Sequence, residues 1–444
     1  MIRLVYNLIL ILILPGVVAY HYYRSRSRGR RSAFRERFGF IAGEELAPVR
    51  GERVVWVHAV SVGETIASFP LLKGLKARYP GHRLVLTNMT ETGRSVALKS
   101  GLADLCLYLP FDYRFAVDAA LAKVRPELII LMETELWPNF IAAAARKGIP
   151  VLLANGRISD RSYGRYLRLS WFFRPILEDI SALCMQSAED AARITAIGAA
   201  RQTVHVTGNL KFDVPLADST PERIAKLKAA YGIPGAAFVF TAASTHPGEE
   251  EAALDAYQGL LSGPGLHFLV LAPRHPERAA VVAELLAQRG IPYLLRSQLS
   301  GAGRALGPGE VLLLDTVGEL AGLYGASDLV FMGGSLVPVG GHNPLEAASC
   351  GVPVLFGPHM ENFRETAALF IASGAGERVP DASGLVAAVA LLAGSPAKRL
   401  EMGRCGFRLL QENSGATSRH LDIAAALLAG TPARSGAAPE GRTP

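Results

Sequence analysis

Short apolar runs recur along most of the chain, and the segments between them carry apolar residues at helical spacing. Short, uninterrupted apolar runs are typical of parallel strands that helices cover on both faces. The expected strands form one series at 54–57, 84–86, 105–109, 128–132, 151–153, 182–185 and 204–206, and a second at 238–240, 268–271, 311–314, 329–332 and 352–356. This alternation predicts two doubly wound, Rossmann-like α/β domains that face a cleft.

The two series of strands set the expected domain boundaries, at residues 50–211 and 225–400. Residues 212–224 separate them and contain prolines among polar residues, which suits a linker. Residues 401–430 have helical spacing, and we expect this helix to pack back onto the first domain. Residues 431–444 are mostly Ala, Gly, Arg and Pro, a composition that predicts disorder.

The start of the chain is apolar and then abruptly basic. An apolar run as long as 4–23 can cross a hydrocarbon core as a helix, so we predict a membrane anchor over residues 1–23. The juxtamembrane segment 24–49 opens with seven arginines within 24–37, which favours the cytoplasmic side and attracts anionic lipid headgroups. The expected location is therefore the cytoplasmic face of an inner membrane.

Two other interpretations of this segment stay open. A cleaved signal peptide needs small residues before its cleavage site, whereas bulky His21, Tyr22 and Tyr23 stand there. A helix that lies in the membrane interface is the second alternative, because Pro15 interrupts the hydrogen bonding of a straight helix.

Composition narrows the classes of partner and cofactor. The net charge is +7, from 46 basic and 39 acidic residues, and much of the excess lies in the arginine segment. No basic face with interleaved aromatics is evident, so no nucleic-acid partner is expected. The 4 cysteines are scattered without metal-ligand spacing, which fits a reducing cytoplasm. No D-x-D motif occurs, which weakens any mechanism that needs a diphosphate-bound metal.

A glycine-rich stretch in the second domain is the sharpest candidate site. Gly333 and Gly334 precede Asn343, which is expected to cap a helix with Pro344 at its first position and Glu346 at its third. Glycines permit close approach of a ligand, a helix start favours phosphate, and a carboxylate suits ribose hydroxyls. A plain helix cap with tight turns explains the same residues equally well.

Two further candidates follow strands of the second domain. Arg274 comes after the strand 268–271, where ligands of open α/β sheets bind, and its guanidinium suits phosphate oxygens. Ser244 comes after 238–240 and precedes an expected helix. A surface arginine and a hydroxyl-rich turn are the structural alternatives.

In the first domain, Glu64 begins a helix directly after the first strand and could act as a general base. The alternative is a first-turn glutamate that interacts with the helix dipole. Ser61 and His58 are nearby, but the spacing lacks the G-x-S-x-G pattern of serine hydrolases.

Glu133 and Glu135 follow the strand 128–132, and Lys211 follows 204–206 near the domain boundary. Carboxylates there can bind a substrate or assist proton transfer, and a lysine can stabilise a departing phosphate. Caps or surface salt bridges are the alternatives for each.

Together these motifs resemble the bacterial 3-deoxy-D-manno-octulosonic acid (Kdo) transferases over nearly the whole chain. The resemblance is carried by RERFG (35–39), HAVSVGET (58–65), PFDYRFAV (110–117), METELWPN (132–139), TGNLKFD (207–213), STHPGEE (244–250), APRHPER (272–278), DTVGELAGLYGASD (315–328) and GGHNPLEAASCGVPVLFGPH (340–359). It implies a GT-B fold and transfer of Kdo from CMP-Kdo to a lipid A precursor, lipid IVA, in lipopolysaccharide biosynthesis. It also implies inversion at the anomeric centre without a bound metal or other cofactor.

The resemblance also implies roles for individual residues. Glu64 corresponds to the catalytic base, and Glu133 and Lys211 correspond to a supporting pair, with Glu135 as the alternative to Glu133. The implied CMP pocket comprises Pro273, Arg274, Val317, Gly318, Glu319, Asn343, Pro344, Leu345 and Glu346, with Ser244, Gly333 and Gly334 as further possible donor contacts. Two competing functions are a nucleotide-sugar epimerase or transferase with another donor, and a non-enzymatic membrane scaffold.

Overall fold

The computed structural model describes residues 2–27, 31–299 and 304–430, so the tail at 431–444 that is expected to be disordered lies outside the described residues. The chain divides into two compact units. Unit 1 comprises Met1–Asp213 and Ser414–Pro444, and unit 2 comprises Val214–Asn413. Each unit contains one parallel sheet with helices around it, so the predicted α/β class is confirmed.

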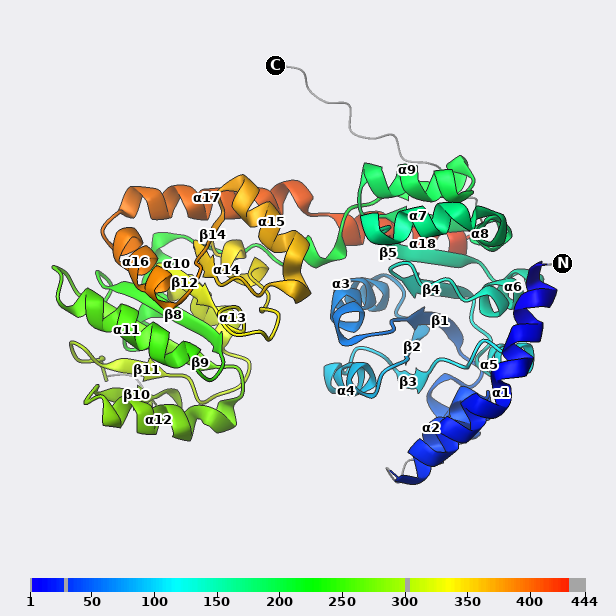
Figure 1. The fold of residues 1–444 in the computed structure, drawn as a ribbon, viewed down its shortest axis with the longest axis horizontal. Coiled ribbons are helices and arrows are strands. Elements are labelled where there is room, and N and C mark those ends of the chain that lie inside the picture. Colours follow the sequence, from blue (N-terminus) through cyan, green and yellow to red (C-terminus); the bar gives the residue numbers. More distant parts are fainter. Residues whose placement is uncertain (1, 28–30, 300–303, 431–444) are drawn as a thin grey trace, which may run out of the picture. The chain divides into compact units, whose positions relative to one another are not determined.

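The sheet of unit 1 has the order β3-β2-β1-β4-β5-β6-β7, and all neighbouring strands are parallel (Figure 1). Its strands are β1 (Arg53–His58), β2 (His82–Asn88), β3 (Leu105–Tyr108), β4 (Leu128–Met132), β5 (Val151–Gly156), β6 (Ala182–Met185) and β7 (Val204–Val206). The order reverses between β1 and β4, and ligands of open α/β sheets bind at the carboxyl ends beside such a reversal.

Helices cover both faces of this sheet. The helices of unit 1 are α1 (Ile2–Ser27), α2 (Arg31–Arg37), α3 (Val62–Arg78), α4 (Glu91–Ser100), α5 (Arg114–Val124), α6 (Pro138–Arg146), α7 (Asp160–Arg168), α8 (Ser170–Leu177), α9 (Ala188–Ile197) and α18 (Ala416–Leu428). Trp56 of β1 joins a core with α5, α6, α8 and α9, whereas its neighbours Val55 and Val57 join a core with α3, α4 and α18. The continuous apolar runs therefore reflect burial on both sides.

Unit 2 repeats this plan with the order β10-β11-β9-β8-β12-β13-β14. The strands are β8 (Phe238–Thr245), β9 (His267–Pro273), β10 (Tyr293–Leu295), β11 (Val311–Leu313), β12 (Leu329–Met332), β13 (Val354–Phe356) and β14 (Gly376–Arg378). The helices are α10 (Pro221–Ala230), α11 (Glu249–Leu261), α12 (Ala279–Gln288), α13 (Leu320–Leu323), α14 (Leu345–Ser349), α15 (Arg364–Ser373), α16 (Ala382–Ala393) and α17 (Pro396–Asn413). The order reverses between β8 and β12, which places a second candidate ligand site at their carboxyl ends.

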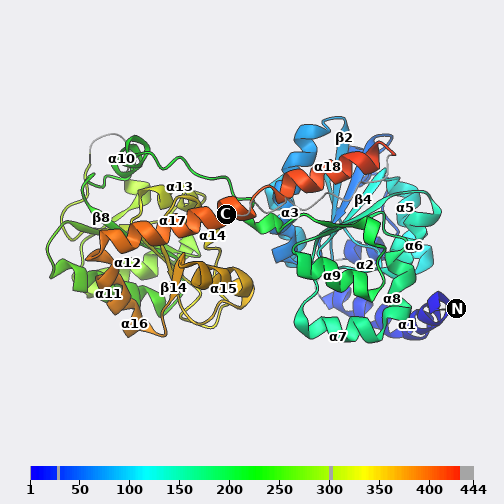
Figure 2. The same cartoon turned by 90° about the horizontal axis from the view of Figure 1, so that it is seen from above.

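Two helices cover the end of the described chain where the sequence predicted one. α17 belongs to unit 2, and α18 belongs to unit 1, where it lies beside α3 (Figure 2). Asp213 accepts hydrogen bonds from the Gly415 and Ala416 N–H groups at 2.6 and 3.2 Å, which caps the start of α18. A Cβ at Gly74 of α3 would lie 2.5 Å from Leu421 Cδ1, so a glycine lets α3 and α18 approach.

The N-terminal helix α1 contacts the rest of unit 1 along most of its length. One stripe of the helix is half-buried, and it consists of Arg3, Tyr6, Asn7, Leu10, Leu14, Val17 and His21. Large apolar side chains on the rest of its surface remain exposed, among them Leu4, Leu8 and Leu12. Among the described residues, 3–23 form the one stretch of helix that is long and apolar enough to cross a membrane by length and composition.

Candidate active site

Unit 1 brings Glu64 and Glu133 to neighbouring strand ends. β1 and β4 pair in parallel, with His58 opposite Leu131. Glu64 lies in the first turn of α3, six residues after β1, and Glu133 directly follows β4. The two carboxylates therefore occupy the position at which the strand order reverses.

Hydrogen bonds hold the Glu64 carboxylate in one orientation. Its Oε2 accepts from the Val60 N–H at 2.7 Å, and its Oε1 accepts from the Ser61 hydroxyl at 2.9 Å. Ser61 also caps α3 by accepting from the Glu64 N–H at 3.3 Å. Burial raises the pKa of Glu64, these hydrogen bonds oppose the rise, and the charge of Glu133 adds to it. Glu64 thus stabilises the helix start and is also a carboxylate of increased basicity.

Glu133 has a left-handed backbone conformation, with φ of 54°. Its N–H donates to the Ala154 carbonyl at 2.7 Å, which ties the end of β4 to β5. Its Oε1 lies 3.7 Å from Lys211 Nζ. A left-handed conformation costs a residue with a Cβ roughly 1 kcal/mol or more, and such residues concentrate at functional sites.

Glu135 belongs to the same group of charges. Burial, followed by the charges of Glu64 and Glu133, raises the pKa of Glu135 to about 7. The site therefore contains three interacting carboxyl groups, of which one changes its protonation near neutral pH, beside the ammonium group of Lys211.

Lys211 lies in a turn that brings it close to the three carboxyl groups, and a residue of β5 holds this turn in place. The turn is the 3-10 helix η3 (Leu210–Phe212), and the Leu210 N–H donates to Asn155 Oδ1 at 2.9 Å. Asn155 has a φ of 57°, and its own N–H donates to His420 Nε2 of α18 at 3.0 Å. The position of the lysine thus depends on residues that no local motif connects with it.

His58 and Ser61 have separate partners. His58 Nδ1 lies 3.0 Å from Thr87 Oγ1, whereas the Ser61 hydroxyl donates to Glu64. Burial lowers the pKa of His58 to about 3, so the ring is neutral at physiological pH. The serine-hydrolase interpretation therefore lacks its serine–histidine hydrogen bond.

Three buried nitrogens near these strand ends have no hydrogen-bond partner within the described part of the chain. They are His58 Nε2, Trp137 Nε1 and Asn155 Nδ2. Buried polar atoms are nearly always paired in folded proteins, so unpaired ones at a strand reversal are available to a ligand or to water.

Unit 2 builds its candidate site in the same way, at the ends of β8 and β12. Ser244 has a φ of 54°, and a Cβ at Gly333 would lie 2.4 Å from the Ser244 carbonyl oxygen. The Arg274 N–H donates to the Thr245 carbonyl at 3.0 Å, so the loop that follows β9 is tied to the same place. Only a glycine fits at 333, and the structure brings Ser244, Gly333 and Arg274 together.

Glu249, a residue that the sequence interpretation missed, organises this site. It is fully buried at the start of α11. Its Oε1 accepts from the N–H groups of Ser335 and Leu336, each at 2.9 Å. Its Oε2 accepts from those of Gly334 at 2.7 Å and His246 at 3.0 Å. One carboxylate therefore holds the loops after β8 and β12 together, and the acidic run in the 244–250 motif was the signal for it.

The segment Asn343–Glu346 differs in register from the expectation. α14 begins at Leu345, with Pro344 rather than Asn343 at its N-cap, so Glu346 is the second helical residue. Asn343 still assists the helix start, because its Oδ1 accepts from the Leu345 N–H at 3.1 Å. Burial raises the pKa of Glu346, and a hydrogen bond with Asn343 opposes this rise.

The remaining predicted donor residues follow β9 and β11. Pro273 is the buried last residue of β9. Glu319 accepts from Arg296 Nε at 2.8 Å and from the Thr316 hydroxyl at 2.9 Å, so its carboxylate has partners within unit 2. Val317 is 84% exposed, and Gly318 has a φ of 87°. In the described part of the unit, no hydrogen bond or ion pair joins this turn to the residues at the ends of β8 and β12.

A polar network connects α1 with the segment that follows β4. The Tyr6 hydroxyl donates to Asp112 Oδ2 at 2.9 Å, and the amides of Asn7 and Asn139 exchange hydrogen bonds of 3.1 and 2.9 Å. Asp112 also accepts from the N–H groups of Asn139 and Phe140, at 2.9 and 2.8 Å, and so caps α6 from another loop. Burial raises the pKa of Asp112 to about 6.

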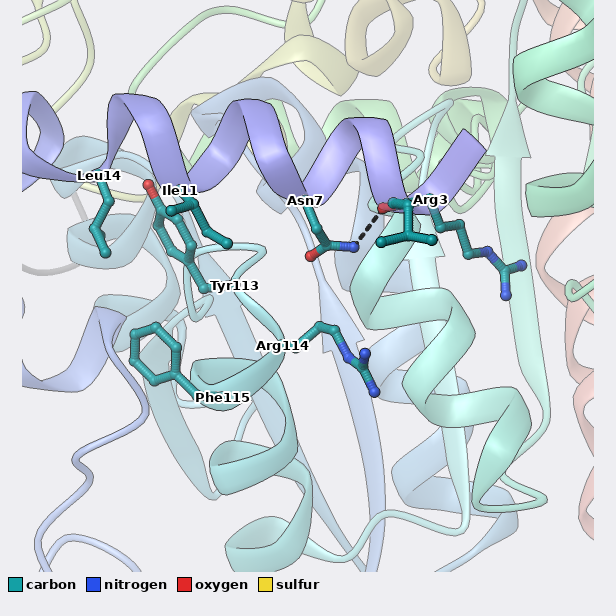
Figure 3. A pocket seen from close by; sticks show the side chains of 8 residues that line it. Arg3, Asn7, Ile11, Leu14, Tyr113, Arg114 and Phe115 are labelled. Carbon is teal, nitrogen blue, oxygen red and sulfur yellow. Dashed lines mark hydrogen bonds between the residues drawn. The ribbon is translucent and has the colours of Figure 1, made fainter. Parts of the chain in front are cut away.

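A groove of about 510 Å³ lies between α1 and the start of α5 (Figure 3). Apolar side chains and two arginines surround it, and the lining residues are Arg3, Leu4, Asn7, Ile11, Leu14, Tyr113, Arg114 and Phe115. Apolar walls beside cationic groups suit the acyl and anionic parts of a lipid.

Comparison with known proteins identifies the family. The family model described as 3-deoxy-D-manno-octulosonic-acid transferase (kdotransferase) matches residues 32–214. A 3-deoxy-D-manno-octulosonic acid transferase of Haemophilus influenzae is 36% identical over 396 residues, which cover 88% of this chain and 91% of the relative. A transferase of the same description from Bordetella pertussis is 38% identical over 402 residues, which cover 87% and 90%.

The chain belongs to the Kdo transferase family. It is accordingly a glycosyltransferase of lipopolysaccharide biosynthesis, and the predicted resemblance is confirmed. A solved UDP-GlcNAc 2-epimerase from Neisseria meningitidis has a TM-score of 0.52, is 16% identical and covers 85% of this chain and 100% of its own. At that identity the likeness extends to the fold alone, which is the GT-B type of paired Rossmann-like units. The Kdo transferase relatives therefore decide against the epimerase alternative.

Proposed function

We propose that this Kdo transferase moves Kdo from CMP-Kdo to lipid IVA, with inversion and with Glu64 as the general base. The observation that carries the proposal is the group of charges at the strand reversal of unit 1. Glu64 is held there by two hydrogen bonds, and Glu133 lies beside Lys211. A carboxylate whose pKa is raised accepts a proton from a hydroxyl more readily than an ordinary glutamate does.

In this mechanism, Glu64 takes the proton of the acceptor hydroxyl as that oxygen attacks the anomeric carbon of Kdo. The bond from that carbon to the phosphate oxygen breaks, and CMP leaves with the electron pair. Lys211 and Glu133 position the reacting groups, and the ammonium of Lys211 offsets negative charge at the site. Removing the base should cost about 10²–10⁴-fold in rate.

The donor site that we propose is in unit 2. It comprises Pro273, Arg274, Val317, Gly318, Glu319, Asn343, Pro344, Leu345 and Glu346, with Ser244, Gly333 and Gly334 at the ends of β8 and β12. Arg274 provides a cation for the phosphate, and the glycines allow close approach of the backbone. We propose that the reaction needs no bound metal and no other cofactor. In the described ranges, no group of three or more His, Cys, Asp or Glu side chains is arranged to hold a metal ion.

We also propose that the enzyme works at the cytoplasmic face of the inner membrane, where α1 lies in the interface rather than across the bilayer. The support is the half-buried stripe from Arg3 to His21, since a helix that packs along a soluble domain keeps only its outer surface for lipid. Anionic lipids and the lipid A precursor are the expected membrane partners, and nucleic acid is not.

The test replaces Glu64 with glutamine, which retains the size of the side chain and one accepting oxygen. We expect E64Q to lower kcat for Kdo transfer to lipid IVA about 10²–10⁴-fold while the KM for CMP-Kdo changes little. Transfer is measured with the full-length protein in detergent, with and without EDTA, by mass spectrometry of the lipid product.

The matched control is S61A, which removes a partner of the same carboxylate and the cap of α3 but retains the base. Its expected loss of stability is about 1 kcal/mol, with kcat reduced far less than in E64Q. Near-normal turnover of E64Q, or an equal loss in S61A, would contradict the role of Glu64 as base, and inhibition by EDTA would contradict metal independence.

A further inference from the structure

Two histidines of unit 2 form a pair that the mechanism above does not use. His246 follows β8, and His342 precedes α14. Their Nε2 atoms lie 2.9 Å apart, and the rings are nearly parallel, with 7° between their planes. A Cβ at Gly334 would lie 3.1 Å from His342 Nε2 and 3.5 Å from His246 Cδ2, so the pair lies beside the glycine loop at the end of β12.

Buried hydrogen bonds hold this pair in place. Glu249 accepts from the backbone N–H groups of His246 and Gly334. The Gly341 N–H, adjacent to His342 in the chain, donates to the Gly334 carbonyl at 2.7 Å. The two rings are therefore attached to the same rigid set of loops as Ser244 and Arg274.

The contact between two ring nitrogens limits the charge of the pair. One hydrogen lies between the Nε2 atoms, and a second would bring two N–H groups into opposition. Burial and nearby cations lower the pKa of His342 to about 4 and also lower the pKa of His246. The charged and titratable groups that face the pair are the cationic or titratable Arg274, His275 and Arg278, and the acidic Glu249 and Glu250. Without a ligand the pair is neutral at pH 7.

We propose that His246 and His342 form an oxyanion subsite of the donor pocket, which becomes a cation by taking up one proton when the anion binds. This inference rests on the proposed function, because the donor supplies two such groups, a phosphodiester and a carboxylate. Binding of an anion together with a proton brings no net charge into the half-buried site. The subsite therefore distinguishes an anionic nucleotide-linked sugar acid from a neutral nucleoside.

The first experiment measures proton uptake by calorimetry of the full-length protein at pH 7, in two buffers of different ionisation enthalpy. The ligands are cytidine 5′-methylphosphate, a phosphodiester without a sugar acid, and cytidine, which has neither anion. If the phosphate is the group that binds at the subsite, the wild type takes up roughly 0.5–1 proton when it binds the phosphodiester and none when it binds cytidine. H246Q and H342Q lose this uptake.

The second experiment measures the KM for CMP-Kdo against pH, because CMP-Kdo also has the carboxylate. From the lowered pKa of the free pair up to the pKa of the pair in the complex, a range that includes pH 7, the KM of the wild type should rise with pH by up to about tenfold per unit, and the dependence should be flat in H342Q. Uptake with the phosphodiester assigns the phosphate to the pair. If the KM depends on pH but the phosphodiester binds without proton uptake, the carboxylate of Kdo is the group that binds the pair.

The control variant is H267Q, since His267 is the first residue of β9, at the opposite end of the strand from Arg274. It should retain both proton uptake and the dependence of KM on pH. Thermal unfolding and cytidine binding identify any variant that fails to fold.

The inference is overturned by binding without proton uptake together with a KM that is independent of pH. It is also overturned by uptake that persists in both histidine variants. Either result can occur while Kdo is transferred normally, so failure of the subsite is distinguishable from failure of the proposed function.

Discussion

At the scale of single residues, both candidate sites contain a backbone conformation that residues with a Cβ rarely adopt. Glu133 and Ser244 each have a φ of 54°, one at the end of β4 and the other near the end of β8. The cost of about 1–2 kcal/mol persists only where the surrounding structure imposes it. Hydrogen bonds from neighbouring strands do so here, which is why the composition of the motifs could not predict it.

Glu133 leads to a prediction about the pH profile. In the proposed mechanism activity requires ionised Glu64, and burial and then the charge of Glu133 raise the pKa of that carboxyl. In E133Q this repulsion disappears, so the pKa of Glu64 falls and activity persists to lower pH. We expect the acidic limb of kcat against pH to move downward, on a lower plateau because Lys211 also loses its partner.

The control for this prediction is E127Q. Glu127 is partly exposed and pairs with Arg53 and His82, outside the group of carboxylates. Its acidic limb should match that of the wild type. An unmoved limb in E133Q would mean that the charge of Glu133 does not raise the pKa of Glu64.

At the scale of elements, the apolar runs predicted twelve strands at positions where the structure has them. β10 and β14 were missed because they are short and mix exposed with buried residues, as in Gly376–Arg378. The pattern also predicted which strand ends would carry Glu64, Glu133 and Arg274. It could not predict contacts between distant loops, such as those made by Asn155 or Glu249, because these depend on the order of strands within each sheet.

Glu249 gives a prediction at this scale. E249Q replaces one oxygen, which accepts two N–H groups, with a donor, so unit 2 should lose about 2–4 kcal/mol of unfolding free energy. All three tryptophans, Trp56, Trp137 and Trp171, belong to unit 1. The unfolding transition of unit 2, measured by circular dichroism, should therefore move to a lower urea concentration. The transition measured by tryptophan fluorescence, which reports unit 1, should not change.

E251Q is the matched control in the same turn of α11. Glu251 is exposed and accepts from the Gly248 N–H at 3.1 Å, so its loss should cost less than about 1 kcal/mol. A fluorescence transition that moves together with the circular dichroism in E249Q would contradict the local role of Glu249.

At the scale of the whole molecule, the N-terminal helix belongs to unit 1 and also exposes large apolar side chains. Its hydropathy predicted an anchor, whereas its polar residues at helical spacing, Arg3, Tyr6 and Asn7, were the signal that one side packs on protein. A helix that spans the membrane meets lipid on all sides, whereas a helix that lies in the interface meets lipid on one side. In the structure, one stripe of the helix contacts Asp112, Asn139 and other residues of unit 1.

Membrane attachment is predicted to depend on the exposed side of α1. Leu8 and Leu12 are 58% and 72% exposed, and replacing both with glutamine should weaken binding to anionic liposomes at least tenfold, because roughly 2 kcal/mol of apolar burial is lost for each. L98Q, at an equally exposed leucine of α4 (59%), should bind as the wild type does. Flotation of liposomes measures both. Equal binding by the double variant would exclude this surface as the membrane contact.

The return of α18 to unit 1 has a consequence for synthesis on the ribosome. Domains usually fold in order as they emerge, with the N-terminal one first. Here, residues 214–413 form unit 2 from one continuous segment, whereas unit 1 lacks the partner of Asn155 and the cover over α3 until residues 416–428 have been translated. Unit 2 is therefore the first that can complete its fold, and unit 1, which bears Glu64, completes its fold only after residues 416–428 have been translated.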